Sequence, residues 1–178
     1  MQRLIVLSFL ITAGAAFATP IPPNMPRPDA GLWEMKTTVA EMGGVAMTFE
    51  SCMGGSVEEL LRRPEVENAD CQDMKVTYAD NRMTARAICT IEGSRTEIVS
   101  DFTGDFRKSY RGQIRSTYSP PLRGMQQTTA AVEGRWIAAD CLPGQKPGDA
   151  RMKGGINVPG LGNIDLDALM KNMPGSGR

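Results

Sequence analysis

Apolar and polar residues alternate along most of the chain between positions 31 and 141. An alternation with a period of two residues is typical of β-strands that bury one face. The first two alternating stretches, residues 31–39 and 45–51, predict a hairpin. The later stretches follow one another at short intervals and predict an antiparallel meander. The fold class that we expect is therefore mainly β.

One short helix is expected between the first hairpin and the later strands. Ser56 and Glu59 stand three residues apart, as in a capping box, where each side chain bonds the backbone N–H of the other residue. The helix opens after Ser56 and runs to Arg63, because Pro64 removes a backbone donor and ends it.

Charge and apolar matching suggest how the meander strands pair. A tight turn at Gly93 and Ser94 places Arg86 opposite Asp101, a favourable cross-strand pair. The following turn is expected to be centred on Gly104. In these registers, apolar residues also face apolar residues, which supports the antiparallel arrangement.

Four cysteines, Cys52, Cys71, Cys89 and Cys141, allow two disulfides with three connectivities. The hairpin register leaves Cys71 and Cys89 one residue from direct opposition, and a bulge or an irregular strand start at Cys71 would bring them within bonding distance. We therefore predict a Cys71–Cys89 disulfide and, by elimination, a Cys52–Cys141 disulfide. The cysteines have 18, 17 and 51 residues between them, which does not match the paired spacing of metal ligands.

The start of the chain has the pattern of a secretory signal peptide. Arg3 precedes an apolar run over residues 4–11, and an A-F-A motif ends at Ala18. The run is too short to span a bilayer, which takes about 20 apolar residues. We expect residues 1–18 to be cleaved after Ala18 and the protein to be exported to the periplasm without a membrane span.

Three further segments follow this leader. Residues 19–30 contain five prolines and predict an extended, poorly packed arm. Residues 31–142 form the expected disulfide-stapled β domain. Residues 143–178 are rich in Gly and Pro and predict a disordered C-terminal tail, in which residues 164–172 can form a short helix.

Several of these features together resemble a known family. The motif G-L-W-E starts at Gly31, the motif G-R-W starts at Gly134 and leads to Cys141, and the two middle cysteines flank a hairpin. Over residues 30–142 the chain resembles the bacterial exported family known as domain of unknown function 3617. The resemblance implies a small exported β-rich domain with no established activity or cofactor, so no catalytic residues can be carried over.

Composition excludes several kinds of chemistry. The chain has no histidine, which excludes serine–histidine and cysteine–histidine catalysis and histidine-bound zinc. Its 20 basic residues balance 20 acidic ones, whereas nucleic-acid binders normally carry a basic excess. The twelve methionines are scattered without an M-x-M cluster, so we interpret them as core residues rather than a copper site. We expect no catalytic residues, no metal and no cofactor.

The predicted inner face of the meander combines small residues with aromatic ones. Small residues allow a sheet to curve strongly, so we expect it to curl into a barrel-like or half-barrel form that can leave a cavity. The alternative is a closed core filled by the helix and the aromatic rings. The residues expected to face a ligand are Tyr78, Ala87, Phe102, Phe106, Tyr110, Gly112 and Trp136.

These observations lead to two hypotheses about function. The first is a non-enzymatic exported β domain that binds a small apolar or lipid-like ligand. The alternative is a structural or interaction protein of the cell envelope that docks a partner through its C-terminal tail. The sequence identifies neither the ligand nor the partner.

Overall fold

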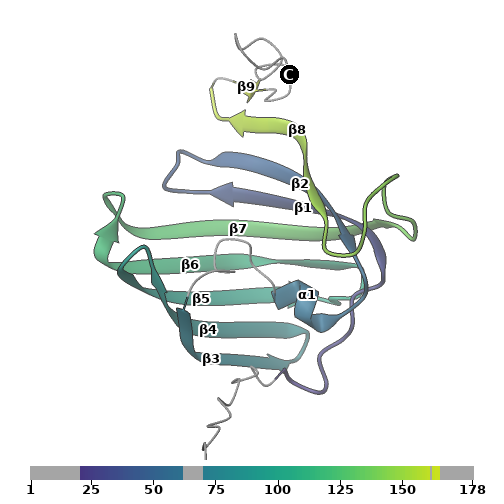
Figure 1. Cartoon of the computed structure of the whole chain (residues 1–178), viewed down its shortest axis with the longest axis horizontal. Coiled ribbons are helices and arrows are strands. Elements are labelled where there is room, and N and C mark those ends of the chain that lie inside the picture. The colour runs from purple at the N-terminus through teal and green to yellow at the C-terminus, as the bar shows by residue number, and fades with distance from the viewer. Residues whose placement is uncertain (1–20, 62–69, 161, 165–178) are drawn as a thin grey trace, which may run out of the picture.

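The computed structural model describes residues 21–61, 70–160 and 162–164. Within these ranges the chain forms one open antiparallel sheet of nine strands, in the order β3-β4-β5-β6-β7-β1-β2-β8-β9, and one short helix (Figure 1). The elements are β1 (Gly31–Val39), β2 (Val45–Met53), α1 (Val57–Leu61), β3 (Asp70–Ala79), β4 (Arg82–Ile91), β5 (Ser94–Gly104), β6 (Ser109–Leu122), β7 (Met125–Ala138), β8 (Ala150–Val158) and β9 (Gly162–Ile164). The predicted fold class, mainly β with one short helix, is confirmed.

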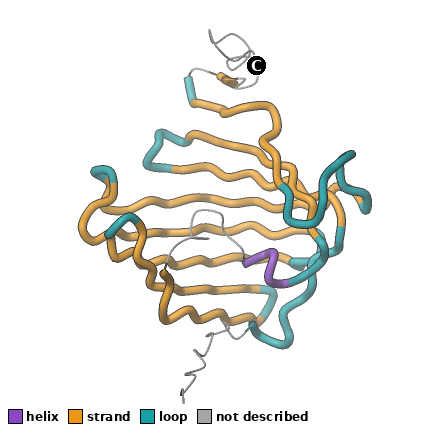
Figure 2. Tube along the Cα trace, viewed as in Figure 1, coloured by secondary structure: helices purple, strands orange, loops and turns teal. Residues whose placement is uncertain are grey.

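The first hairpin and the meander join into a single sheet. Strands β3 to β7 pair in chain order, and β1 then pairs with β7 rather than standing apart. The connection from β2 to β3 contains α1, which lies over one face of the sheet (Figure 2). In the described part of the chain, no helix is long and apolar enough to cross a membrane.

The predicted capping box opens α1. The backbone N–H of Glu59 donates to Ser56 Oγ at 3.3 Å, and the backbone N–H of Ser56 donates to Glu59 Oε2 at 3.1 Å. This reciprocal pair satisfies donors that a helix start otherwise leaves open, and it places Ser56 at the N-cap.

The turn between β4 and β5 lies one residue earlier than predicted. Glu92 and Gly93 form it, with φ angles of 48° and 80°, the left-handed pair that a type I′ hairpin requires. Arg86 therefore lies opposite Val99 rather than Asp101, a shift of two residues. Because side chains alternate with a period of two, this shift leaves every residue on its predicted face.

The turn between β5 and β6 is wider than predicted and is not centred on Gly104. Gly104 lies opposite Tyr110, and the four residues 105–108 connect the end of β5 to the start of β6. The carboxylate of Asp105 accepts the backbone N–H groups of Lys108 and Ser109, each at 2.9 Å. This side-chain bonding closes the wider loop, and apolar matching between strands could not reveal it.

Both predicted disulfides are present. Cys71 and Cys89 are direct partners on β3 and β4, and the register then shifts between Gln72 and Lys75. Asp73, with φ at 53°, occupies this irregularity. The predicted bulge is therefore confirmed, since it brings two cysteines that would otherwise miss each other into opposition.

The second disulfide, Cys52–Cys141, joins the end of β2 to the segment that follows β7, with its Cα atoms 5.3 Å apart. The backbone N–H of Cys52 also donates to the carbonyl of Asp149 at 2.8 Å. The chain leading into β8 is thus held at the same point as the disulfide.

The proline-rich arm is packed, contrary to our prediction. Over residues 21–30 the arm packs against the sheet, with a turn in which Met25 N–H donates to the carbonyl of Pro22, and Met25 is buried in the core with 6% of its surface exposed. Asp29 donates its backbone N–H to the carbonyl of Arg107 and forms an ion pair with that guanidinium at 3.0 Å. Its own carbonyl accepts Trp33 Nε1–H. A proline-rich segment can still bury side chains and bond to its neighbours.

The predicted disordered tail is wrong over residues 150–158, which form β8. This strand pairs with β2, and Arg151 lies opposite Glu50 with an ion pair at 3.0 Å. High Gly and Pro content lowers strand propensity, but a neighbouring strand and an ion pair override it. The predicted helix at 164–172 lies outside the described residues except Ile164, which belongs to β9. The signal peptide also lies outside them.

Candidate binding cavity

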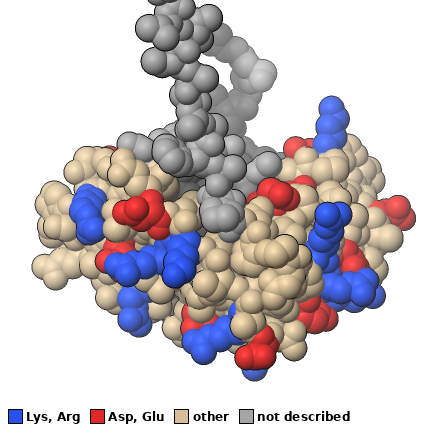
Figure 3. All heavy atoms as spheres, turned by 90° about the horizontal axis from the view of Figure 1, so that it is seen from below, with Lys and Arg blue, Asp and Glu red and all other residues tan. Residues whose placement is uncertain are grey.

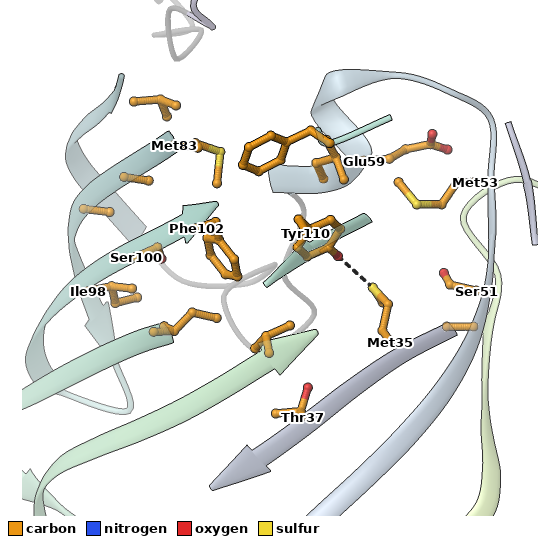
Figure 4. A pocket seen from close by; sticks show the side chains of 18 of the residues that line it. Met35, Thr37, Ser51, Met53, Glu59, Met83, Ile98, Ser100, Phe102 and Tyr110 are labelled. Atoms are coloured by element: carbon orange, nitrogen blue, oxygen red, sulfur yellow. Dashed lines mark hydrogen bonds between the residues drawn. The ribbon is translucent and has the colours of Figure 1, made fainter. Parts of the chain in front are cut away.

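The concave face of the sheet holds a cavity of about 510 Å³ that is partly open to solvent. Residues of strands β1 to β8 and of α1 line it, shown from close by in Figure 4. Strands β3 and β8 stand seven places apart in the sheet order, and both reach this one cavity. The sheet must therefore curl strongly, which agrees with the half-barrel form that we predicted.

One wall of the cavity, from β3, β4 and β5, is mainly apolar. Ala85 lies between Val76 and Ser100 on the neighbouring strands, and Ala87 lies opposite Ile98. All five residues line the cavity. The small side chains of the two alanines and the serine leave space that larger residues would fill.

Methionines form a second feature of the lining, which the sequence analysis missed. Five of the twelve methionines line the cavity, namely Met35, Met53, Met74, Met83 and Met152. They come from five different strands, so no local spacing pattern could reveal their proximity. Unbranched thioether side chains adapt to irregular shapes, which suits a cavity that must fit a ligand.

Aromatic rings pack together at one end of the cavity. Phe106 stacks on Tyr110 with centroids 6.0 Å apart, and Phe102 meets the Tyr110 ring edge-on at 5.7 Å. Trp33, which is fully buried, lies 5.9 Å from the same ring. Tyr110 is therefore the centre of this aromatic group.

Four of the seven residues expected to face a ligand line the cavity: Ala87, Phe102, Phe106 and Tyr110. The other three, Tyr78, Gly112 and Trp136, are not among the lining residues. The Tyr78 ring packs edge-on against Phe106 at 5.6 Å and donates its hydroxyl to Asn81.

Gly112 and Trp136 are kept from the cavity by their neighbours. A Cβ on Gly112 would lie 2.6 Å from Phe102 Cδ1, so the Phe102 ring covers this glycine. Trp136 donates its Nε1–H to the carbonyl of Ala30 at 3.0 Å, and Lys108 Nζ lies 4.7 Å from its ring centroid. Alternation along a strand assigns a face, but it does not tell which neighbour lies over a residue.

A few polar side chains reach the cavity from the other wall. Tyr110 Oη donates to Met35 Sδ at 3.3 Å, as the dashed line in Figure 4 shows. Ser51 donates its hydroxyl to the carbonyl of Asp149 at 3.4 Å, and Thr37 also lines this wall. These groups could orient a ligand that carries a polar end.

Two charged residues, Glu59 and Arg86, also belong to the described lining. The Glu59 carboxylate accepts the backbone N–H groups of Gly54, at 2.8 Å to Oε2, and of Ser56. The Arg86 guanidinium is exposed and forms an ion pair with Glu97 at 2.9 Å. Both charges therefore already have protein partners.

The groups with shifted pKa values belong to surface ion pairs, to loops and to the start of α1. A hydrogen bond from Arg82 lowers the pKa of Asp101, and hydrogen bonds from Lys153 and Arg135 lower that of Glu34. In Figure 3, acidic and basic side chains alternate over the visible surface. These shifts are produced by charged pairs on the outside of the sheet.

Comparison with known protein families gives a match. No curated protein and no solved structure matches the chain. The family model described as "Protein of unknown function (DUF3617)" matches residues 26–141. This range contains β1 to β7 and all four cysteines, whereas β8 lies beyond it. The chain therefore belongs to the DUF3617 family of proteins of unknown function.

Proposed function

We propose that this protein is an exported, non-enzymatic β domain that binds a small apolar or lipid-like ligand in its concave cavity. The observation that carries the proposal is the cavity itself, about 510 Å³ with a mainly apolar lining. Small-molecule sites typically measure roughly 300–1,000 Å³ and combine apolar walls with a few polar groups.

Export to the periplasm is part of the proposal. The pattern of a signal peptide over residues 1–18 supports it. The two disulfides also support it, because such bonds persist in oxidising compartments and are rare in the cytosol.

The chemistry at the cavity supports binding rather than catalysis. The Glu59 carboxylate is engaged by backbone donors at the start of α1. Cys52, Cys71 and Cys89 line the cavity as half-cystines, so they cannot act as thiolate nucleophiles.

The first experiment is native mass spectrometry of the protein purified from the periplasm. We expect a reproducible non-covalent adduct, together with an intact mass that corresponds to cleavage after Ala18 and two disulfides. A second measurement is titration with N-phenylnaphthylamine, a neutral apolar fluorophore whose emission rises in apolar surroundings. A protein that carries no adduct and does not bind the fluorophore would contradict the proposal.

Two matched variants test whether binding takes place in the cavity. Ala85 lines the cavity, so Ala85→Phe should fill it and weaken fluorophore binding at least about tenfold, or about 1.4 kcal/mol. Val99 is 42% exposed on the outer face of the neighbouring strand, so Val99→Phe should bind as the wild type does. Equal binding by a folded Ala85→Phe protein would place the ligand elsewhere.

A further inference from the structure

The two walls of the cavity differ in their polar groups. The wall from β3, β4 and β5 carries the buried apolar residues Val76, Ala87 and Ile98. Ser100 contributes a hydroxyl group to this wall. The facing wall, from β1, β2 and α1, carries more oxygen atoms (Figure 4). Its oxygen-bearing side chains are Thr37, Ser51 and Glu59. A ligand with one apolar end and one polar end would match this division.

The charge at the polar wall is negative and fixed in position. Glu59 accepts the backbone N–H of Gly54 with both carboxylate oxygens, at 2.8 and 3.0 Å, and that of Ser56 at 3.1 Å. These bonds fix the carboxylate at the start of α1, in the lining of the cavity.

Arg86, the other charged residue in the described lining, does not neutralise the charge of Glu59. Arg86 is exposed, and its guanidinium lies 2.9 Å from Glu97. Arg86 and Glu97 alternate with the buried residues Ala87 and Ile98, which places both charges on the outer face of the sheet. A ligand's head group at the polar wall therefore meets a carboxylate and hydroxyl groups.

We propose that the cavity selects single-chain amphiphiles with an uncharged head group over fatty acids. This inference rests on the proposed function and specifies its ligand class. A fatty-acid carboxylate next to Glu59 would bring two like charges together, which is unfavourable. A glyceride head carries hydroxyl groups that can donate to the carboxylate and to Ser51 Oγ, and that can accept from Thr37 instead.

The test compares ligands with the same acyl chain on the full, disulfide-bonded protein. Monolaurin, laurate and dodecylamine are each titrated against bound N-phenylnaphthylamine at neutral pH, below their critical micelle concentrations. From this competition we expect monolaurin to bind at least about tenfold more tightly than laurate, a difference of about 1.4 kcal/mol in binding free energy. Dodecylamine, which is cationic, should bind no more weakly than monolaurin. This ranking needs only the wild-type protein.

A pair of variants separates the charge of Glu59 from its role in the helix cap. Glu59→Gln removes the charge and retains a hydrogen-bond acceptor, so the affinity for laurate should rise to within about twofold of that for monolaurin. Ser56→Ala removes the other half of the capping box and leaves the charge in place. This control should keep the preference for monolaurin.

Each outcome gives a clear answer. Equal binding of laurate and monolaurin by the wild type would overturn the inference and leave the proposed function intact. A loss of preference in Ser56→Ala equal to that in Glu59→Gln would also overturn it, because the shape of the helix start would then explain the selection. If none of the three amphiphiles and no fluorophore binds, the proposed function itself fails.

Discussion

The ring of Tyr110 lies directly over Gly134 on the neighbouring strand. The two residues are partners in the β6–β7 register, and a Cβ on Gly134 would lie 2.3 Å from Tyr110 Cζ and 2.4 Å from Cε1. The missing side chain lets the ring extend across β7 towards β1, where its hydroxyl donates to Met35 Sδ. A glycine on one strand thus positions the hydroxyl of a tyrosine on another.

Gly134→Ala should destabilise the protein, because the added methyl group collides with the ring. Overpacking of this kind typically costs about 1–3 kcal/mol, and we expect a loss in that range. Urea unfolding at equilibrium measures it. Fluorophore binding should also change, since Tyr110 lines the cavity and would have to move.

A double-mutant cycle tests whether the ring is the cause. In a Tyr110→Ala background the obstructing atoms are absent, so the alanine at position 134 should cost much less there than in the wild type. The same cost in both backgrounds would show that the backbone of β7, and not Tyr110, requires the glycine.

Gly112→Ala should destabilise the protein more than Gly134→Ala does, and truncation of a neighbouring side chain should not reduce this cost. A Cβ at this position would lie 2.0 Å from the backbone oxygen of Asp101, which cannot move without distorting β5. We expect a loss of about 3 kcal/mol or more. Truncating Phe102, the nearest side chain, should not restore stability, and urea unfolding of the double variant checks this. A double variant as stable as Phe102→Ala alone would contradict the prediction.

The sequence predicted strand faces better than strand registers. Alternation alone assigns Ala87 and Ile98 to the inner face, and a slip of two residues between β4 and β5 does not change this. The registers depend on the turns, and these follow local bonding that the sequence shows only weakly. Glu92 adopts a positive φ that glycine usually supplies, and the Asp105 carboxylate closes a loop.

The composition of the cavity could be predicted only in part. Tyr110 and Phe102 belong to the alternating pattern of the meander, so their inward position was predictable. Met35 and Met152 lie 117 positions apart in the sequence, and Phe49 lies opposite both of them in the sheet. Long-range strand order decides such contacts, and a single sequence does not specify it.

Removal of each disulfide should have a different effect on stability. The Cys71–Cys89 bond spans 18 positions and the Cys52–Cys141 bond spans 89. In the loop-entropy account, these bonds are worth about 3 and between about 4 and 5 kcal/mol respectively. We expect the Cys52→Ala/Cys141→Ala protein to unfold at lower urea than the Cys71→Ala/Cys89→Ala protein. The reverse order would show that local packing around Cys89 outweighs the entropy of the longer loop.

Acid should weaken the attachment of β8, through a ladder of charges on the outer face. Lys153 on β8 donates to Glu34 on β1 at 2.8 Å, and Arg135 on β7 donates to the same carboxylate at 2.9 Å. These hydrogen bonds lower the pKa of Glu34 below its ordinary value of 4.5. A lowered carboxyl pKa stabilises the folded state above the unfolded pKa, and the contribution disappears as the pH falls through the folded value.

Hydrogen exchange at the β8 amides measures this effect locally. Exchange in β8 should accelerate, after correction for the intrinsic rate, as the pH drops below about 4.5, and Glu34→Gln should show a similar acceleration already at neutral pH. The Arg135 and Lys153 side chains are 68% and 51% exposed, so solvent screens both pairs and the change should amount to about 1 kcal/mol or less. Asp101→Asn is the matched control, because it breaks an acid-sensitive pair with Arg82 that does not touch β8. If Asp101→Asn accelerates β8 exchange as much as Glu34→Gln does, the acid response belongs to the sheet as a whole and not to this ladder.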